Sequence, residues 1–495
     1  MGYFPVIGLE IHTELKTKTK MFCGCLNDPD EKNPARNASH SDAGGPNVNI
    51  CPVCMGHPGT LPVINKEAVR KVIKTGLAVD CQILEDSKFD RKNYFYPDLP
   101  KGYQISQYDK PLCLKGVLKV GEKNIEITRI HLEEDTGKLA HSAGQEYSLV
   151  DFNRAGIPLM ELVTEPVITS AKEAREFAEK FQLILRYIGV SDADMEKGQM
   201  RVEANISITK DLKKLGTKVE IKNLNSFKSV ERGIDYEIKR QEEVLISGGK
   251  IIQETRGWDE VKGKTFSQRE KEGAHDYRYF PEPDLPPMEI SSELINEIKA
   301  ELPELPSQRG ERFKRDYFLD EKIAEVLVAN KSLGDYFEKV VSTVKNREDK
   351  NFIKLASNYI ITVLQSFFNK SSSVKSTEGK DFKASPENFA EVILSVEDGR
   401  ISSTIAKVIL EEMFETGKNP SLIIKEKGLV QITDEGDLNS IVKEVISENQ
   451  KAVEDFKKGK EASVQFMIGK LMEKTKGKAN PDIVRKLLRD NLAGS

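Results

Sequence analysis

Long apolar runs are missing from this sequence. None of its apolar stretches approaches the ~18 residues that a membrane-spanning helix needs, and residues 359–364 form one of the longest. The N-terminus also lacks a basic segment followed by an apolar one, so we expect no secretory signal. Both observations predict a cytoplasmic protein that makes no use of a membrane.

Cysteine is scarce, with six residues in 495, which argues against a disulfide scaffold. Cys81 and Cys113 stand apart and are expected to be small core residues. The other four form two doublets that bracket a loop rich in Gly, Pro, Asn and Asp, and these are Cys23, Cys25, Cys51 and Cys54. The doublets predict a structural zinc site, because four thiolates leave no coordination position open for a substrate. Reduced thiols without a metal, or a redox pair, are the alternatives.

Motifs for phosphate binding are also missing. Residues 257–265 resemble a P-loop, but five residues separate the two glycines instead of four, and no convincing buried strand precedes them. Protein-kinase motifs do not occur either. Both absences weaken the hypothesis of a free-standing metal-dependent ATPase or kinase.

Excess positive charge is absent from the chain as a whole, whose net charge is -4. Local patches must therefore carry any binding to nucleic acid. Residues 451–490 contain eleven Lys and Arg against six Asp and Glu, a balance of +5. This stretch suits a phosphate backbone, and a solvated helix face is the alternative. The candidates in it are Lys457, Lys458, Lys476, Lys478, Arg485 and Lys486.

What the sequence does contain begins with an alternating strand at residues 6–15. Its apolar side chains point to one face, and Glu10, His12 and Glu14 point to the other. A polar face exposed to water is the simpler explanation. Glu161 adds weight to a binding site, because it interrupts the apolar run 156–163 and a buried acid is costly unless it is paired or bound to a metal.

Two further segments, 88–108 and 275–287, interleave cations, aromatic rings and prolines. Aromatic rings can stack on bases while cations meet phosphates, so both segments suit a nucleotide or RNA surface. A surface loop with partly buried tyrosines would have the same composition. These segments belong to the strand-rich part of the chain.

The distribution of helix and strand signals predicts an α+β protein of about three domains. Residues 1–292 are expected to form a mixed, largely antiparallel domain. From Ser291 onward helix formers dominate, which predicts an all-α domain at 293–418 and an all-α tail at 419–495. We expect residues 452–475 to form one helix.

Several long motifs together resemble one family, the B subunit of the aspartyl/glutamyl-tRNA amidotransferase, or GatB family. The resemblance covers essentially the whole chain, from the first strand to the tail. Besides the two cysteine doublets, it is carried by residues 6–12, 91–98, 102–107, 131–135, 223–227 and 276–284.

This resemblance implies a cradle domain with a kinase-like site, a helical domain and a YqeY-like tail that grips tRNA. The implied enzyme is a carbon–nitrogen ligase that uses ATP to phosphorylate the side-chain carboxylate of misacylated Glu-tRNA(Gln), Asp-tRNA(Asn) or both. Ammonia then displaces the phosphate. Since the chain has no amidase signature, the ammonia is expected from a partner glutaminase of the amidase type (GatA), with a small third protein (GatC) completing a heterotrimer.

The resemblance also assigns roles to residues. It implies that Mg²⁺ is held by Glu10, His12, Glu134 and Glu161, and that the four clustered cysteines bind Zn²⁺. Strand alternation does not decide between Glu133 and Glu134, and the family favours Glu134. Histidine is an uncommon ligand of Mg²⁺, so His12 is expected to act through water or with a different metal. Candidates for contact with ATP or the aminoacyl end are Lys92, Asn93, Tyr94, Tyr96, Lys101, Arg201, Asn205 and Arg278.

Two other functions compete with this one. A module that only presents charged tRNA to other proteins would also need a basic tail, but it would need no buried acids. The hypothesis of a free-standing metal-dependent ATPase accounts for the buried acids but not for the basic tail.

Overall fold

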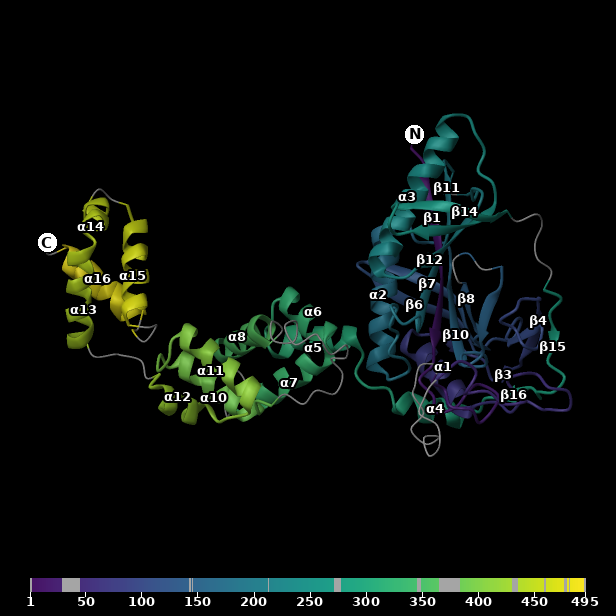
Figure 1. The fold of residues 1–495 in the computed structure, drawn as a ribbon, viewed down its shortest axis with the longest axis horizontal. Helices are drawn as coiled ribbons and strands as arrows, with labels where there is room; N and C mark the ends of the chain where they lie inside the picture. Colours follow the sequence, from purple (N-terminus) through teal and green to yellow (C-terminus); the bar gives the residue numbers. More distant parts are fainter. Residues whose placement is uncertain are drawn as a thin grey trace. The chain divides into compact units, whose positions relative to one another are not determined.

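The structure is a computed structural model that describes residues 2–28, 45–141, 144, 146–211, 213–270, 277–344, 349–364, 383–429, 435–457, 460–475, 479 and 481–493. It forms two compact units, residues 1–305 and 306–495 (Figure 1). Helix α4 (Ser292–Ala300) packs on α1 (Lys66–Ala78) and so belongs to the first unit. The division of the chain into three domains stays a prediction.

A nine-stranded sheet organises the first unit, in the order β14-β13-β12-β11-β1-β10-β7-β6-β2. Neighbouring strands are antiparallel except β12 and β13, which run parallel. This confirms the predicted α+β class with a mixed, largely antiparallel sheet. In sheet order the strands are β14 (Lys264–Glu270), β13 (Glu254–Asp259), β12 (Val219–Leu224), β11 (Met200–Thr209), β1 (Phe4–Glu14), β10 (Pro158–Thr164), β7 (Lys123–Glu134), β6 (Cys113–Val120) and β2 (Gln82–Ile83).

Two long helices, α2 (Ala171–Tyr187) and α3 (Phe227–Ile246), lie side by side against one face of this sheet (Figure 1). Both start at a serine whose hydroxyl accepts a hydrogen bond from a backbone N–H of the first turn. Ser170 accepts from Glu173 at 3.2 Å, and Ser226 accepts from Ser229 at 3.0 Å. These caps satisfy amide groups that otherwise have no partner at a helix start.

Strand β1 lies in the middle of the sheet, and its side chains alternate as predicted. Ile7, Leu9 and Ile11 are buried and share one core with Phe177 and Phe181 of α2. Because side chains alternate along a strand, the polar residues of β1 point to the face that these helices do not cover.

Small sheets accompany that polar face. One has the order β15-β4-β5, and its strand β5 packs along β7 of the large sheet. The small strands are β3 (Asp86–Ser87), β4 (Asp90–Asn93), β5 (Tyr103–Ser106), β8 (Lys138–His141), β9 (Ser148–Asp151), β15 (Phe280–Pro281) and β16 (Met288–Glu289). The P-loop-like segment 257–265 is a hairpin in which Trp258 pairs with Thr265, so its rejection is confirmed.

The second unit is helical throughout its described part. Its helices are α5 (Pro306–Asp316), α6 (Glu321–Ala329), α7 (Lys331–Ser342), α8 (Lys350–Tyr359) with the π-helical turn Ile360–Leu364, α10 (Pro386–Glu397), α11 (Ser403–Thr416), α12 (Pro420–Lys427), α13 (Glu435–Glu448), α14 (Gln450–Lys457), α15 (Ala462–Lys474) and α16 (Pro481–Ala493). Helices α13 to α16 share an apolar core of their own. No helix in the described ranges is long and apolar enough to cross a membrane.

The prediction of a single helix over residues 452–475 is wrong. Helix α14 ends at Lys457 and α15 begins at Ala462. The sequence places Gly459 between them, and glycine is a poor helix former because it loses the most backbone freedom. Two short helices can then pack against each other within the core of the tail.

Candidate active site

A row of polar side chains crosses four strands of the large sheet. His12 of β1 pairs with Arg201 of β11 on one side and with Glu161 of β10 on the other. Glu161 in turn pairs with His131 of β7. Directly opposed residues on neighbouring strands lie about 5 Å apart, so pairing register alone brings these side chains together.

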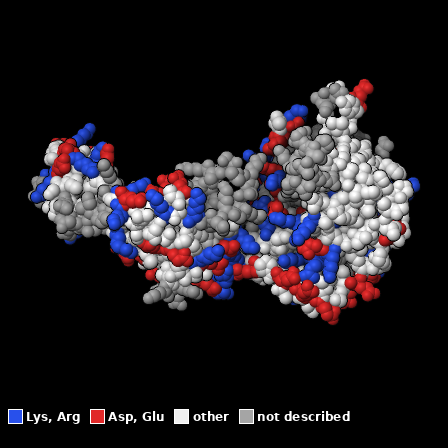
Figure 2. Space-filling view, turned by 60° about the horizontal axis from the view of Figure 1, so that its bottom comes forward, with Lys and Arg blue, Asp and Glu red and all other residues white. Residues whose placement is uncertain are grey.

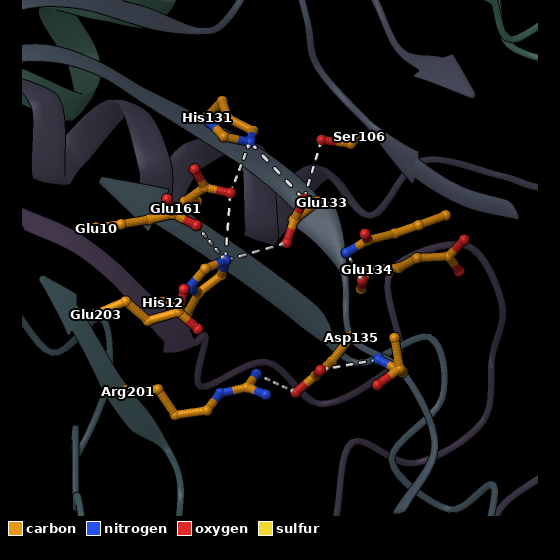
Figure 3. A network of polar contacts seen from close by, with 12 residues as sticks. Glu10, His12, Ser106, His131, Glu133, Glu134, Asp135, Glu161, Arg201 and Glu203 are labelled. Carbon is orange, nitrogen blue, oxygen red and sulfur yellow. Dashed lines mark hydrogen bonds and ion pairs between the residues drawn. The ribbon is translucent and has the colours of Figure 1, made fainter. Parts of the chain in front are cut away.

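The row forms a compact carboxylate–histidine cluster (Figure 3), which we define as Glu10, His12, His131, Glu133 and Glu161. The Nε2 atom of His12 lies 3.2 Å from Glu161 Oε2 and 3.7 Å from the nearest carboxylate oxygens of Glu10 and Glu133. The Nε2 atom of His131 lies 3.4 Å from Glu161 Oε2 and 3.8 Å from Glu133 Oε2. Of the predicted residues, the structure brings Glu10, His12 and Glu161 together.

The charges of the cluster depend strongly on one another. Burial lowers the pKa of His12, but the carboxylates of Glu161, Glu133 and Glu10 outweigh this and raise it to about 9. Burial and the nearby Glu161 raise the pKa of Glu10 to about 7. Burial also raises the pKa of Glu161, yet the imidazoles of His131 and His12 hold it below its ordinary value. The cluster therefore brings carboxylates close together, and protons on His12 and Glu10 offset part of their charge, as a bound cation can also do.

Overlapping sets of these residues could hold a metal ion. In each set one ligand atom per residue lies within 4.8 Å of the others, and the sets are Glu10, His12 and Glu161; His131, Glu133 and Glu161; and Glu10, Glu203 and Glu220. Carboxylate oxygens suit Mg²⁺. The two imidazoles widen the choice toward Mn²⁺ and related cations.

Glu134 lies apart from the cluster. Its carboxylate forms a close ion pair with Lys101 and accepts a hydrogen bond of 3.0 Å from the backbone N–H of Ile105. With Cys23 and Cys54 it lines a cavity of about 210 Å³. The structure therefore places the predicted ligand Glu134, and the predicted nucleotide-contact residue Lys101, beside the cysteines.

Glu133 and His131 are the cluster residues that we did not select from the sequence. Glu133 is 2% exposed and accepts a hydrogen bond of 3.0 Å from Ser106 Oγ. Burial raises its pKa, but the hydrogen bond with His131 and the charge of Lys92 keep it below the ordinary value. His131 and Glu133 are two positions apart in the sequence, as are Glu10 and His12. This repeated spacing is a sequence signal that could have identified both residues.

Arg201 is close to the cluster but is engaged elsewhere. Its Nη2 donates a hydrogen bond of 2.6 Å to Asp135 Oδ2, and Asp135 is 4% exposed. Asn205 lies on the same strand face, opposite Gly8 and two pairs beyond the pair of Glu203 and Glu10. Among the described residues, neither side chain forms a hydrogen bond or ion pair with a member of the metal-binding sets.

Lys92, another candidate for contact with ATP or the aminoacyl end, interacts electrostatically with the cluster. Burial lowers its pKa, but the carboxylates of Glu133 and Glu161 raise it above the ordinary value. Its ammonium lies 5.9 Å from the ring centre of Tyr94 and 5.3 Å from that of Tyr277. A lysine so placed can neutralise an anion that approaches the carboxylates.

The remaining candidates of this group lie at the surface beside β4. Asn93 Nδ2 donates a hydrogen bond of 2.8 Å to the carbonyl oxygen of Arg278. Arg278 and Tyr96 are exposed. Their role as contacts for ATP or the aminoacyl end stays a prediction.

The four cysteines of the two doublets lie together, as predicted. Their sulfur atoms all lie within 4.8 Å of one another, and they belong to Cys23, Cys25, Cys51 and Cys54. The backbone N–H of Cys51 points to Cys54 Sγ at 3.1 Å. This geometry and the soft thiolate donors fit a tetrahedral zinc ion. Cys81 and Cys113 are buried in the core, as expected.

The tail candidates lie partly outside the described residues, which do not include Lys458, Lys476 or Lys478. Lys457 ends α14, and Arg485 and Lys486 belong to α16. On the face seen in Figure 2, Lys and Arg are interspersed with Asp and Glu over the tail, at the left. The tail contains charge pairs, among them Lys474 with Glu448 at 2.7 Å.

Comparison with known families decides the affiliation of the chain. Residues 5–296 match the GatB/GatE catalytic domain, and residues 335–492 match the GatB domain of the YqeY type. The chain belongs to the GatB family. The carboxylate–histidine cluster and the four cysteines lie within the first matched region, and helices α13 to α15 lie within the second.

Relatives of this GatB chain extend over its full length. It is 50% identical to the B subunit of the aspartyl/glutamyl-tRNA(Asn/Gln) amidotransferase of Caldicellulosiruptor saccharolyticus, with 99% of each chain covered. The protein of the same name from Carboxydothermus hydrogenoformans is 49% identical over 99% of each chain. That of Thermotoga maritima is 47% identical over 100% of each chain.

Proposed function

We propose that this chain is the component of a tRNA-dependent amidotransferase that activates misacylated tRNA. The side-chain carboxylate of Glu-tRNA(Gln), Asp-tRNA(Asn) or both attacks the γ-phosphate of ATP, and ADP leaves. Ammonia then displaces the phosphate and forms the amide. The names of the full-length relatives support the substrate class, and the cluster on the large sheet supports the chemistry.

The single observation that carries this proposal is the buried carboxylate–histidine cluster. Glu133 and Glu161 are 2% and 5% exposed and lie on neighbouring strands. Imidazoles and Lys92 offset their charge in part, and Arg129 lies 3.9 Å from Glu161. Burying these acids is costly, and a bound cation would offset the charge that their partners leave. A module that only presents tRNA has no need of it.

The cation we propose is Mg²⁺, held by Glu10, His12, Glu133 and Glu161. When bound, it neutralises charge on the phosphate oxygens, which is the main requirement of phosphoryl transfer. Glu133 replaces Glu134 in this assignment, because its carboxylate faces His12 while that of Glu134 is paired with Lys101.

The residues around the cation site have separate tasks in this proposal. Lys92 places a positive charge next to Glu133 and Glu161, where it can neutralise a phosphate that approaches them. Tyr94 and Tyr277 lie beside that ammonium. Arg201 holds Asp135 and so fixes the end of β7 that carries Glu133.

Three further parts complete the proposal. A partner glutaminase of the amidase type (GatA) supplies ammonia, and a small third protein (GatC) completes the assembly. Zinc at the four cysteines holds the two doublets together. Helices α13 to α16 bind the tRNA. The geometry of the four sulfurs supports the zinc, and the net charge of +5 in residues 451–490 supports the contact with tRNA.

The test uses the chain assembled with its glutaminase partner. Phosphate release from ATP is followed with uncharged tRNA, with misacylated Glu-tRNA and without tRNA, and free ammonium replaces glutamine. We expect phosphate release that requires the misacylated tRNA, followed by amide formation. Turnover that ignores tRNA would indicate a general ATPase. Tight tRNA binding without any turnover would indicate a presenting module.

A further inference from the structure

Lys20 is a completely buried lysine beside the cysteine cluster. Its exposed fraction is 0%. The ammonium donates hydrogen bonds to the carbonyl oxygens of Ala155 at 2.7 Å and Phe152 at 3.2 Å. In the described part of the chain no carboxylate forms an ion pair with it. Burying an ammonium group in this way is unfavourable unless a negative charge lies nearby.

The nearest candidate for that negative charge is a cysteine sulfur. The Nζ atom of Lys20 lies 4.0 Å from Cys54 Sγ. Zn²⁺ bound by four thiolates has a net charge of −2. A lysine beside such a centre is attracted to it, whereas an isolated zinc ion would repel the lysine. An ammonium at this distance offsets part of that charge in a region of low dielectric.

Lys20 also joins the two cysteine doublets. Its backbone N–H donates a hydrogen bond of 2.9 Å to the carbonyl oxygen of Cys25, while its side chain reaches Cys54 of the other doublet. A Cβ atom at Gly156 would be in ordinary contact with Cys54 Cβ at 3.5 Å and with Lys20 Cδ at 3.7 Å, so Gly156 lies beside both residues. Lys20 is 0% exposed, so its ammonium is enclosed beside Cys54.

We propose that Lys20 is the internal counter-charge of a four-thiolate metal centre, and that it raises the affinity of the cysteines for their metal through Cys54. Lys20 is not a ligand, because it acts on a sulfur and not on the metal. The proposal rests on the zinc site proposed above. It adds a residue outside the doublets to the machinery of that site.

The first experiment measures metal affinity in Lys20→Met, which keeps a long unbranched side chain and removes the charge. Zn²⁺ is titrated into the metal-free protein in competition with a chromophoric chelator. Changes next to metal ligands typically cost about 10–100-fold in affinity, and we expect a loss in this range. Lys18→Met is the matched control, because Lys18 is exposed on the same segment, and its affinity should match that of the unmodified chain.

The second experiment tests whether Lys20 acts on the metal site through its charge or only stabilises the fold through its hydrogen bonds to the backbone. Co²⁺ replaces Zn²⁺, and its visible spectrum should report four sulfur ligands in both the unmodified chain and Lys20→Met. The Tm of the metal-free protein is then compared. Without metal, the buried ammonium has lost its counter-charge, so Lys20→Met should leave Tm unchanged or raise it, while the zinc-dependent gain in Tm becomes smaller.

The outcomes are distinct. If Lys20→Met lowers Tm in the metal-free protein and binds zinc as tightly as the unmodified chain, the lysine is only a structural hydrogen-bond donor and the inference is overturned. If the unmodified chain binds neither Zn²⁺ nor Co²⁺ at the cysteines, the metal site itself is refuted. Weaker zinc binding with an intact four-sulfur spectrum supports the inference.

Discussion

Glu133 and Glu134 are neighbours in β7, yet their carboxylates point to opposite faces of the large sheet. Glu133 lies 3.7 Å from His12 Nε2 within the carboxylate–histidine cluster. Glu134 is paired with Lys101 beside the cysteines. One strand therefore supplies an acid to each of two sites, because successive side chains alternate.

This relationship predicts different effects of the same substitution at the two positions. Glu133→Gln should weaken binding of Mg²⁺ or Mn²⁺ at least about tenfold, because it removes a charged donor that faces His12. Glu134→Gln should leave cation binding nearly unchanged, because its partners are Lys101 and Ile105. Isothermal titration calorimetry, or the electron paramagnetic resonance of Mn²⁺, measures both variants. Equal losses in the two would contradict the assignment of Glu133.

The cysteine cluster predicts one zinc ion per chain. Elemental analysis of the purified protein should find it, and Cys51→Ser should lose it because three thiolates remain. Cys81→Ser is the control, since Cys81 is buried in the core away from the cluster. A full zinc content in Cys51→Ser would refute the four-cysteine site.

The hydrogen bond between Arg201 and Asp135 should stabilise the folded chain whether or not a metal ion is bound. This hydrogen bond to the buried Asp135 is 2.6 Å long. Arg201→Met removes this partner, and the free energy of unfolding should fall by about 1–3 kcal/mol. Lys16→Met removes an exposed pair with Asp192 and should cost at most about 1 kcal/mol. Urea unfolding compares the two, and an equal or smaller effect for Arg201→Met would contradict a supporting role for this pair.

The tail predicts a salt-dependent contribution to tRNA binding. A chain that ends at Gly428 keeps α12, whose Ile423 is buried, and loses α13 to α16 with their separate core. Its affinity for tRNA should fall, and the slope of log K against log salt should become less steep because fewer phosphates are contacted. Filter binding at several salt concentrations measures this. An unchanged slope would make the tail a scaffold.

Local signals predicted much of the fold. The alternation in residues 6–15 is set within a few residues, and the structure agrees with it. The break between α14 and α15 was not predicted, because apolar spacing continues across Gly459 in the sequence.

The sequence alone could not predict which residues make up the whole carboxylate–histidine cluster. Glu10, His12 and Glu161 could be selected from alternation and from an acid within an apolar run. The partnership of Glu161 with His131, and the choice of Glu133, follow from the register between β7 and β10. Register is a property of strand pairing, so no single stretch of sequence contains it.

The central claim is that the cluster transfers phosphate to misacylated tRNA, and Glu161→Gln tests it most directly. Glu161 touches both histidines, whereas Glu165, in the control Glu165→Gln, accepts a hydrogen bond from Thr128 outside the cluster. Both variants are assembled with the glutaminase partner and given ATP and misacylated Glu-tRNA. The account predicts that Glu161→Gln binds tRNA normally but loses tRNA-dependent phosphate release by at least about a hundredfold, while Glu165→Gln retains it. Unimpaired phosphate release in Glu161→Gln would contradict the account.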